Sequence, residues 1–444
     1  MSHHLPHART LSADENSDEK TLDETMTGQN KPENDGGFIK SPTDSEEDFP
    51  DGGLRAWLVV GGIMCSSFST FGFVNAWGVF QAYYEENLLK DFDSSTIAWI
   101  GSVQYALVFM PSVVTGRMFD IGYFKAPLLS ASILLVLATF LVAECTQYWH
   151  FLLCQGFTIG LSCGMVFGPS VGIVGHWFRR RRGIAIGLMS TGASVGGTVF
   201  PIVTRELIDA VGFPWTMRII GCILILGLGI ANLTMKRRLP PVNASGGILN
   251  LKAFKSTPYT IWCLSGFVAM LGLYTVLTYI SVSAAAYGIS PDVAFYLVSI
   301  VNASSGVGRI IAGICVDRYG ALNYFGPITV IAGVVTYAWP FARSLASMIV
   351  VAVVYGFTSG AFISSAVNPI YDFGEISDVG RRTGMAFSIA ALGAVAGPPI
   401  SGAINTATKS FEAMGYYAGS AIMLAVALLY VARYVATGTL RGRF

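Results

Sequence analysis

Charged side chains are scarce in this sequence. Asp, Glu, Lys and Arg together make up 12% of its 444 residues, whereas 53% of the residues are hydrophobic. An average soluble domain has about 25% charged residues, which it uses to cover its surface. The composition therefore excludes an ordinary soluble protein. The net charge of +1 provides no field that would attract nucleic acid, so we expect no nucleic-acid partner.

Metal-ligating and nucleophilic residues are also few and scattered. The chain has seven cysteines and five histidines, and six of the cysteines lie singly inside apolar runs. Their spacing matches neither a metal site nor a disulfide framework. No set of nucleophile, base and orienting group occurs in or beside these runs. We therefore predict no metal, no cofactor and no enzymatic activity.

Long apolar runs dominate the chain. Twelve of them follow residue 55, each close to the roughly 20 residues with which a helix crosses the hydrocarbon core of a bilayer. A buried core helix would explain one or two such runs, and a membrane β-barrel would show short alternating strands instead. We predict an all-α membrane protein with twelve transmembrane helices, over residues 56–82, 96–116, 126–144, 149–175, 183–204, 215–235, 258–284, 293–316, 322–342, 346–370, 383–407 and 414–436.

Polar segments divide the chain into parts. Residues 1–53 are acidic and poor in aromatic side chains, so they cannot bury enough apolar area to offset chain entropy, and we predict a disordered cytosolic tail. A stretch with Pro240, Pro241, Gly246 and Gly247 separates the sixth run from the seventh. The predicted parts after the tail are an N-terminal six-helix bundle over 54–235, a cytosolic linker over 236–257, a C-terminal six-helix bundle over 258–436 and a cytosolic tail over 437–444.

Lys and Arg residues concentrate in the loops on one side of the predicted membrane. Because cytosolic loops carry an excess of these cations, we predict that both termini and the linker face the cytosol. We expect the plasma membrane rather than a vacuolar or other internal membrane. The opposite side has only scattered cations such as Lys90, Arg205, Arg343 and Lys409. The cations of the first side are Arg117, Lys125, Arg179, Arg180, Arg181, Arg182, Lys236, Arg237, Arg238, Lys252, Lys255, Arg318, Arg381, Arg382, Arg441 and Arg443.

Two short motifs occur once in each half of the chain. The second run ends in GRMFDIG (116–122) and the eighth in GICVDRYG (313–320), so that an Asp follows a Gly by four residues in both. Arginines then precede a glycine at RRRRGIAIG (179–187) and at GRRTGMAF (380–387). The interval from Asp to the last of these arginines is 62 residues in the first half and 65 in the second. The repetition predicts two pseudo-symmetric six-helix halves.

These motifs resemble those of the major facilitator superfamily. Its loop motif Gly-x-x-x-Asp-Arg-x-Gly matches 313–320 fully, whereas Ile121 takes the place of the Arg in the first copy, which is one residue short. PDGGLRAW (50–57) and HWFRRRRGIAIGLMSTGASVGG (176–197) are similar to the two signatures of the monocarboxylate porter family, especially of its fungal members. The resemblance implies the major facilitator fold and transport by alternating access.

The resemblance also implies where the transporter would close. The motif acids and arginines of such proteins form gate contacts at the cytosolic side. In this chain they correspond to Asp120, Asp317, Arg318, Arg182 and Arg382. The alternative is that the basic clusters only set the topology.

Arg309 is the clear case of a charge deep inside a predicted span. It lies eight residues before Asp317, about 12 Å from that end of the helix at about 1.5 Å per residue. No Asp, Glu or Lys lies comparably deep in the predicted spans, so a bound anion would supply the missing charge. A guanidinium suits a carboxylate bidentately, and the resemblance also implies a substrate-binding arginine here. The alternative is an arginine held by backbone carbonyls or reaching toward the cytosol.

Other polar residues inside the spans are candidates to line a cavity. Polar groups buried among transmembrane helices need partners, and those partners can be other helices or a substrate. Proton-coupled members of the resembled family have a lysine where this chain has Asn75 and an aspartate where it has Ser305, so proton coupling stays open. The substrate-binding candidates beside Arg309 are Asn75, Gln104, Tyr274 and Asn302, with Tyr105, Tyr279 and Asn368 as further cavity candidates.

We therefore expect a secondary active or facilitative transporter of a small organic solute, with a monocarboxylate-like anion as substrate. Its partners would be that solute and the lipid bilayer. The alternatives are an exporter or importer of a larger metabolite, such as a secondary metabolite or a vitamin like riboflavin, and a non-transporting sensor with the same fold.

Overall fold

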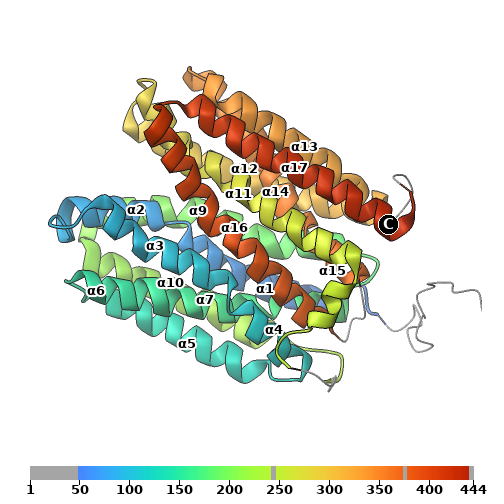
Figure 1. The fold of residues 1–444 in the computed structure, drawn as a ribbon. Coiled ribbons are helices and arrows are strands. Elements are labelled where there is room, and N and C mark those ends of the chain that lie inside the picture. Colours follow the sequence, from blue (N-terminus) through green and yellow to red (C-terminus); the bar gives the residue numbers. More distant parts are fainter. Residues whose placement is uncertain (1–48, 242–246, 374–377, 440–444) are drawn as a thin grey trace, which may run out of the picture. The chain divides into compact units, whose positions relative to one another are not determined.

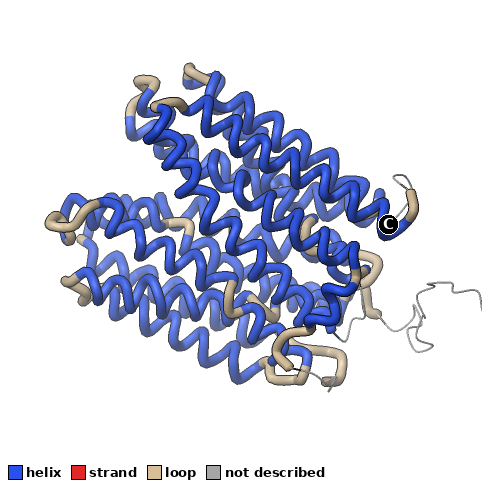
Figure 2. The backbone as a smooth tube through the Cα atoms, viewed as in Figure 1, coloured by secondary structure: helices blue, strands red, loops and turns tan. Residues whose placement is uncertain are grey.

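The computed structural model describes residues 49–241, 247–373 and 378–439. Within these ranges every regular element is helical (Figure 2). The predicted disordered tail over 1–53 and the predicted tail over 437–444 lie largely outside the described residues. Residues 49–444 form one compact unit, which contains all the elements described below.

Twelve spans among the described residues are long and apolar enough to cross a membrane, which confirms the predicted number (Figure 1). The six spans of the first half are Gly53–Leu88, Ser94–Asp120, α5 (Lys125–Val142), Tyr148–Trp177, α9 (Arg182–Val211) and α10 (Phe213–Thr234). Those of the second half are α11 (Thr257–Ala286), α12 (Pro291–Tyr319), Ala321–Phe341 with α13 (Ala321–Ala338), Leu345–Asp372, α16 (Val379–Thr408) and α17 (Phe411–Thr437).

Several spans are interrupted, and prolines explain three of the interruptions. A proline lacks the backbone N–H that would continue the helix and clashes with the preceding turn. Pro111 separates α3 (Ser94–Phe109) from α4 (Ser112–Asp120), and Pro169 separates α7 (Gly160–Phe167) from α8 (Ser170–Trp177). Pro369 stands in the first turn of α15 (Asn368–Asp372), which follows α14 (Leu345–Ser365). The sequence predicts each of these spans as one continuous helix.

The first span is interrupted without a proline. It consists of α1 (Gly53–Ser67), the π-helical turn η2 (Phe68–Gly72), α2 (Trp77–Tyr83) and the π-helical turn η3 (Tyr84–Leu88). The fourth span contains a third π-helical stretch, η4 (Leu152–Ile159), after α6 (Tyr148–Phe151). Such π-turns are frequent at functional sites in other proteins. The break between η2 and α2 leaves Asn75 in a turn in the middle of the span.

The two halves contact each other through their inner helices. In the first half α1 packs against α9 and α10, and in the second half α12 packs against α14 and α11 against α17. Between the halves α9 contacts α12 along its length, and α4 contacts α16. Helices α5 and α13 lie away from this boundary, on the outer sides of their halves (Figure 1).

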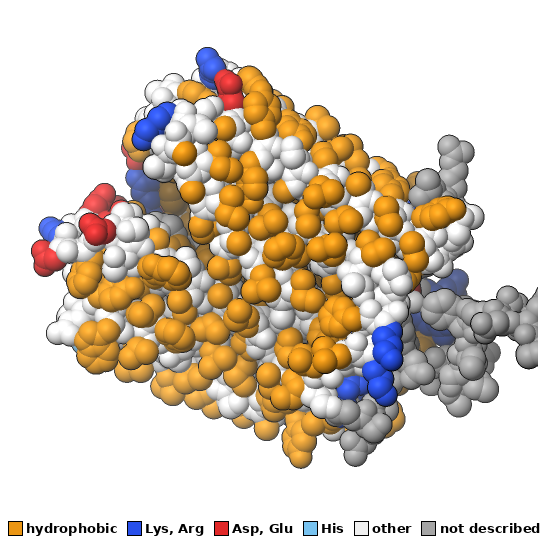
Figure 3. Space-filling view, viewed as in Figure 1, with side chains coloured by type: hydrophobic (Ala, Val, Ile, Leu, Met, Phe, Trp, Pro, Cys, Tyr) orange, Lys and Arg blue, Asp and Glu red, His pale blue; other side chains and the backbone are white. Residues whose placement is uncertain are grey.

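Hydrophobic side chains cover the outside of the helices. The face drawn in Figure 3 is largely orange, and the charged side chains lie near the ends of the helices. Leu226 and Leu233 are 69% and 80% exposed. Such a surface is unfavourable in water but suits the hydrocarbon interior of a bilayer. The protein is therefore a multi-pass integral membrane protein.

We call the side of the molecule on which the described chain begins and ends the terminus-bearing face. It also contains the ends of α4, α8, α10, α12, α15 and α17, because successive spans alternate in direction. The basic clusters at 179–182, 236–238 and 381–382 belong to this face. Its identity as the cytosolic face stays a prediction.

Candidate functional site

A central cavity lies between the two halves. Its walls are mostly apolar and include the rings of Phe71, Phe109, Phe167 and Phe387. Polar side chains are few, and they come from both halves: Ser67, Asn75, Tyr105 and Ser190 from the first, and Tyr274, Asn302, Ser305, Arg309, Tyr355, Ser359 and Ser364 from the second. The cavity therefore suits a largely apolar molecule with a small number of polar groups.

Arg309 on α12 is the charged residue of this cavity. Its side chain is buried, with Nε donating to Ser305 Oγ at 3.3 Å and Nη1 donating to the Ser190 carbonyl at 2.5 Å. Within the described ranges, no Asp or Glu forms an ion pair with it. A buried cation without a counter-charge is unfavourable. Hydrogen bonds to neutral oxygens orient the guanidinium but leave its charge uncompensated; the bond to the Ser190 carbonyl is also the contact that the alternative, an arginine held by backbone carbonyls, predicts.

Three of the other four predicted binding residues line the same cavity. Asn75, in the break of the first span, accepts a hydrogen bond from Tyr105 Oη at 3.4 Å. Asn302 donates to the carbonyls of Gly197 and Val298, at 3.2 and 3.1 Å. Tyr274 also lines the cavity. The structure thus brings Asn75, Tyr274 and Asn302 together with Arg309.

Gln104 is placed elsewhere. It is buried on the side of α3 that packs against α7, where its backbone lies close to Gly160, and it is not among the residues that line the cavity. Two further candidates also lie outside the lining: Tyr279 donates to the Pro398 carbonyl at 3.0 Å, and Asn368 donates to the Ser364 carbonyl at 3.4 Å. Their polar groups connect helices to one another.

The phenylalanine and methionine residues of the lining were not singled out from the sequence. Met189 and Met270 line the cavity together with the phenylalanine rings. In an apolar transmembrane span, a Phe or Met that faces a cavity has the same sequence surroundings as one that faces lipid. No local signal therefore distinguished these residues.

Asp317, at the end of α12, makes the first of two similar contacts between the halves. Its carboxylate accepts hydrogen bonds from the backbone N–H groups of Gly183 at 2.6 Å and Ile184 at 2.9 Å. These are the second and third residues of α9. The first N–H groups of a helix have no partner within the helix and lie at its positive end, so a carboxylate binds well there. Asp317 thus joins the second half to the start of α9.

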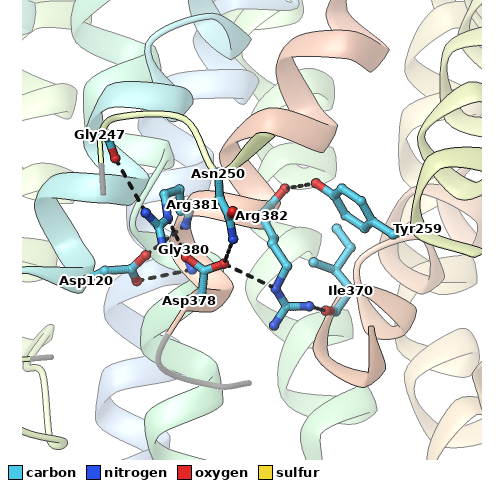
Figure 4. A network of polar contacts seen from close by, with 9 residues as sticks. All are labelled: Asp120, Gly247, Asn250, Tyr259, Ile370, Asp378, Gly380, Arg381 and Arg382. Atoms are coloured by element: carbon cyan, nitrogen blue, oxygen red, sulfur yellow. Dashed lines mark hydrogen bonds and ion pairs between the residues drawn. The ribbon is translucent and has the colours of Figure 1, made fainter. Parts of the chain in front are cut away.

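Asp120, at the end of α4, makes the matching contact from the first half. Its carboxylate accepts hydrogen bonds from the N–H groups of Gly380 at 3.2 Å and Arg381 at 2.9 Å (Figure 4). These are the second and third residues of α16, so the two contacts are equivalent. The repeated motifs of the sequence therefore form two equivalent contacts, each between an acid of one half and a helix start of the other, at the places where the sequence predicts gates.

Glycine is required at both helix starts because the acids approach so closely. A Cβ atom at position 380 would lie 2.5 Å from Asp120 Oδ1, and one at position 183 would lie 2.6 Å from Asp317 Oδ1. Both distances are far shorter than a carbon–oxygen contact allows. The glycine next to the arginines in each repeat, Gly183 after them and Gly380 before them, thus has a steric reason.

The predicted gate arginines have different positions. Arg182 lies across the boundary between the halves: Nη2 is 3.6 Å from the Asp372 carboxylate, and the guanidinium carbon is 4.2 Å from the centroid of the Tyr371 ring. Arg382 bonds within its own half, donating to the Ile370 carbonyl at 2.5 Å (Figure 4). Arg318 lies over the ring of Tyr319, 5.5 Å from its centroid.

The donors to the two acids differ from those that the sequence predicts. The sequence predicts contacts among Asp120, Asp317 and the arginines, whereas the hydrogen bonds that reach Asp120 and Asp317 come from backbone N–H groups. Tyr371, whose hydroxyl donates to the Val171 carbonyl of the other half at 2.5 Å, was also missed. The glycine next to the arginines, Gly183 in the first repeat and Gly380 in the second, was the available signal.

All of these contacts lie at the terminus-bearing face, which is therefore closed. Toward the opposite face, a groove begins at Asn75 and continues between the outer parts of α2, α9, α11 and α12. Arg205 and Asp292 form an exposed ion pair beside it. Figure 3 shows the surface hollowed between the two halves at this end. The structure represents a state in which the cavity is closed at one face and approached from the other.

The family described as Major Facilitator Superfamily matches residues 61–283 and 262–443 of this chain. The chain is 38% identical to the MFS transporter asaE of Aspergillus flavus, covering 89% of this chain and 91% of that protein. It is 34% identical to the aspyridones efflux protein apdF of Emericella nidulans, covering 88% and 80%, and 35% identical to the fujikurins efflux protein of Gibberella fujikuroi, covering 87% and 85%.

Solved structures with the same fold share little sequence with this chain. The human organic anion transporter MFSD10 superposes with a TM-score of 0.65 at 14% identity, covering 84% of this chain and 98% of that one. The E. coli fucose:proton symporter FucP superposes with a TM-score of 0.66 at 16% identity, covering 86% and 99%. At these identities the likeness concerns the arrangement of the helices.

Proposed function

We propose that this chain, which belongs to the Major Facilitator Superfamily, exports a secondary metabolite that carries an acidic group. Membership confirms the transporter expected from the sequence motifs. The narrower expectation of a monocarboxylate porter finds no support in the names of the relatives, two of which are efflux proteins for aspyridones and for fujikurins. Those names favour the alternative of a larger metabolite.

The observation that carries this proposal is the position of Arg309. It brings a buried positive charge into a cavity whose walls are mainly aromatic and aliphatic. A carboxylate or another ionised acid compensates this charge, and an apolar body fills the space between the phenylalanine rings. A single molecule of this kind would contact both the charge of Arg309 and the apolar walls.

The two gates would determine from which face of the membrane the metabolite reaches the cavity. The metabolite enters when the contacts of Asp120 and Asp317 open, binds Arg309, and leaves through the groove at Asn75 when they close again. Exchange of these two states is the alternating access of secondary transporters, in which two halves move around a site at mid-membrane. Export follows if the terminus-bearing face is cytosolic, as the basic loops predict.

Transport of a small monocarboxylate is the second candidate. The observation in its favour is again Arg309, since a guanidinium binds any carboxylate. A small anion such as pyruvate, however, leaves the ring-lined part of the cavity without a contact. The two candidates therefore differ in whether the apolar walls contribute to binding.

The experiment compares variants of Arg309 in a strain from which the gene has been deleted. We expect Arg309→Gln to lower export of the accumulated acidic metabolite by roughly 10- to 100-fold, since a hydrogen bond to a charged group contributes about 1.5 to 3 kcal/mol. Metabolites in cells and medium are measured by mass spectrometry. Flux of the same metabolite and of pyruvate is then measured with purified protein in liposomes.

Arg343→Gln is the matched control, because it removes an exposed arginine far from the cavity. Export by this variant should equal that of the unaltered protein. Full export by Arg309→Gln would contradict the anion site, and flux of pyruvate without flux of the metabolite would favour the second candidate.

A further inference from the structure

The end of α4 is an unfavourable place for the carboxylate of Asp120. The last carbonyl groups of a helix carry a negative partial charge, so an acid beside them needs a nearby cation. In the second copy of the motif Arg318 directly follows Asp317, whereas in the first copy Ile121 follows Asp120 and the basic residue of the last turn of α4 is Arg117, three residues before the acid. The motif of the first gate therefore provides no cation after its acid.

Arg237, which follows α10 in the linker between the halves, brings a cation to this helix end. Its Nη1 donates to the Phe119 carbonyl, and its Nη2 donates to the Asp120 carbonyl at 3.2 Å. The guanidinium carbon lies 5.0 Å from the centroid of the Phe119 ring. Burial lowers the pKa of Arg237, while the charge of Asp120 acts in the opposite direction. A guanidinium nevertheless stays protonated at neutral pH.

The linker itself holds Arg237 in this position. Its Nε donates to the Leu239 carbonyl at 3.0 Å and its Nη2 to the Pro240 carbonyl at 2.9 Å. Pro241 packs onto Gly122, where a Cβ atom would lie 2.8 Å from Pro241 Cγ and where φ is +103°. Glycine is therefore needed for the linker to approach the end of α4 so closely.

The far end of the same linker contacts the partner of Asp120. Asn250 Nδ2 donates to the Asp378 carboxylate at 2.6 Å, and Arg381 Nη1 donates to the Gly247 carbonyl at 3.5 Å (Figure 4). Asp378 immediately precedes α16, and the backbone N–H of Arg381 is one of the two gate donors. One segment thus contacts both sides of the gate.

We propose that Arg237 is a positioning residue for the first gate. From the linker, it supplies the cation that the motif lacks at Ile121 and orients the Asp120 carboxylate toward the start of α16. This inference concerns the gate and holds for any transported solute. The linker would then stabilise the closed first gate in addition to connecting the two halves.

Hydrogen exchange of the gate amides tests this role without a known substrate. The full-length protein is studied in lipid nanodiscs, and exchange is followed by mass spectrometry in the segment 379–386. Arg237→Gln keeps hydrogen-bond donors but removes the charge, and we expect exchange to be about threefold to fivefold faster, the factor that a charge at a helix end provides. Adding Ile121→Arg to this variant should return the exchange to within about twofold of the original.

Two further variants make the test specific. Arg237→Lys keeps the charge, so its exchange should stay near that of the original protein. Lys236→Ala removes a neighbouring cation but keeps the backbone carbonyl that accepts the hydrogen bond of Trp177, so it should change nothing. The proposal is overturned if Arg237→Gln exchanges like Lys236→Ala, if Arg237→Lys is as fast as Arg237→Gln, or if Ile121→Arg fails to restore protection.

Discussion

Arg309 and the groups around it set the electrostatics of the cavity. The described residues that line it include no Asp, Glu, His or Lys. Asn75 and Ser305, which stand where proton-coupled members of the resembled family have a lysine and an aspartate, do not titrate near neutral pH. At the scale of single residues, the cavity holds a fixed charge and lacks a proton acceptor.

We therefore expect transport without proton movement. The affinity for a substrate that is fully ionised should stay constant between about pH 6 and about pH 8, because Arg309 remains protonated throughout this range. A pH-sensitive dye trapped in proteoliposomes checks the prediction when substrate is added. A change in internal pH that depends on both the protein and the substrate would contradict it.

What the sequence predicted of the site depended on how unusual each residue was in its surroundings. Arg309 was found because a charge inside an apolar run has few explanations. Gln104 was misplaced because the spans are apolar on most sides, so the sequence does not tell which side of α3 faces the cavity. The acids Asp120 and Asp317 were found through the repeat. Their donors were not, since every residue but proline has an N–H.

At the scale of elements, the helix starts of α9 and α16 supply the hydrogen-bond donors of the proposed gates. Prolines in the sequence explain three interruptions of the spans, but the π-helical turns in the first and fourth spans have no comparable signal. The close approach of each acid to a helix start also depends on backbone geometry, for which the sequence has no comparable signal. The span count was therefore predictable, whereas the fit of one helix start against an acid was not.

Gly380→Ala tests this fit. The added methyl group would displace Asp120, and overpacking of this kind costs about 1 to 3 kcal/mol. Because both gates open when the halves move apart, we expect faster hydrogen exchange also at the other gate, in residues 183–186, and slower net transport. Gly266→Ala is the control, because nothing lies within 4 Å of a Cβ atom there. Equal exchange in the two variants would argue against a gate at this position.

At the scale of the whole molecule, an even number of spans places both ends of the chain on one side of the membrane. The repeat of six spans and the excess of cations in the loops made this arrangement predictable. The tilt of the halves that closes one face is a property of the assembled helices. No single segment of the sequence encodes it.

Tags on the two ends test the orientation. In sealed plasma-membrane vesicles of known sidedness, both tags should be cleaved by protease only when the cytosolic side is exposed. Cleavage of one tag from each side would contradict the twelve-span topology. Cleavage of both tags from the outer side would reverse the direction of the proposed export.

The use of backbone N–H groups as gate donors has a consequence for how such a protein diversifies. Substitutions at Ile184 or Arg381 leave the N–H in place, unless the new residue is proline. If the proposed function holds, substitutions in the lining near Phe71 or Met270 would alter the cavity while leaving these hydrogen-bond donors in place.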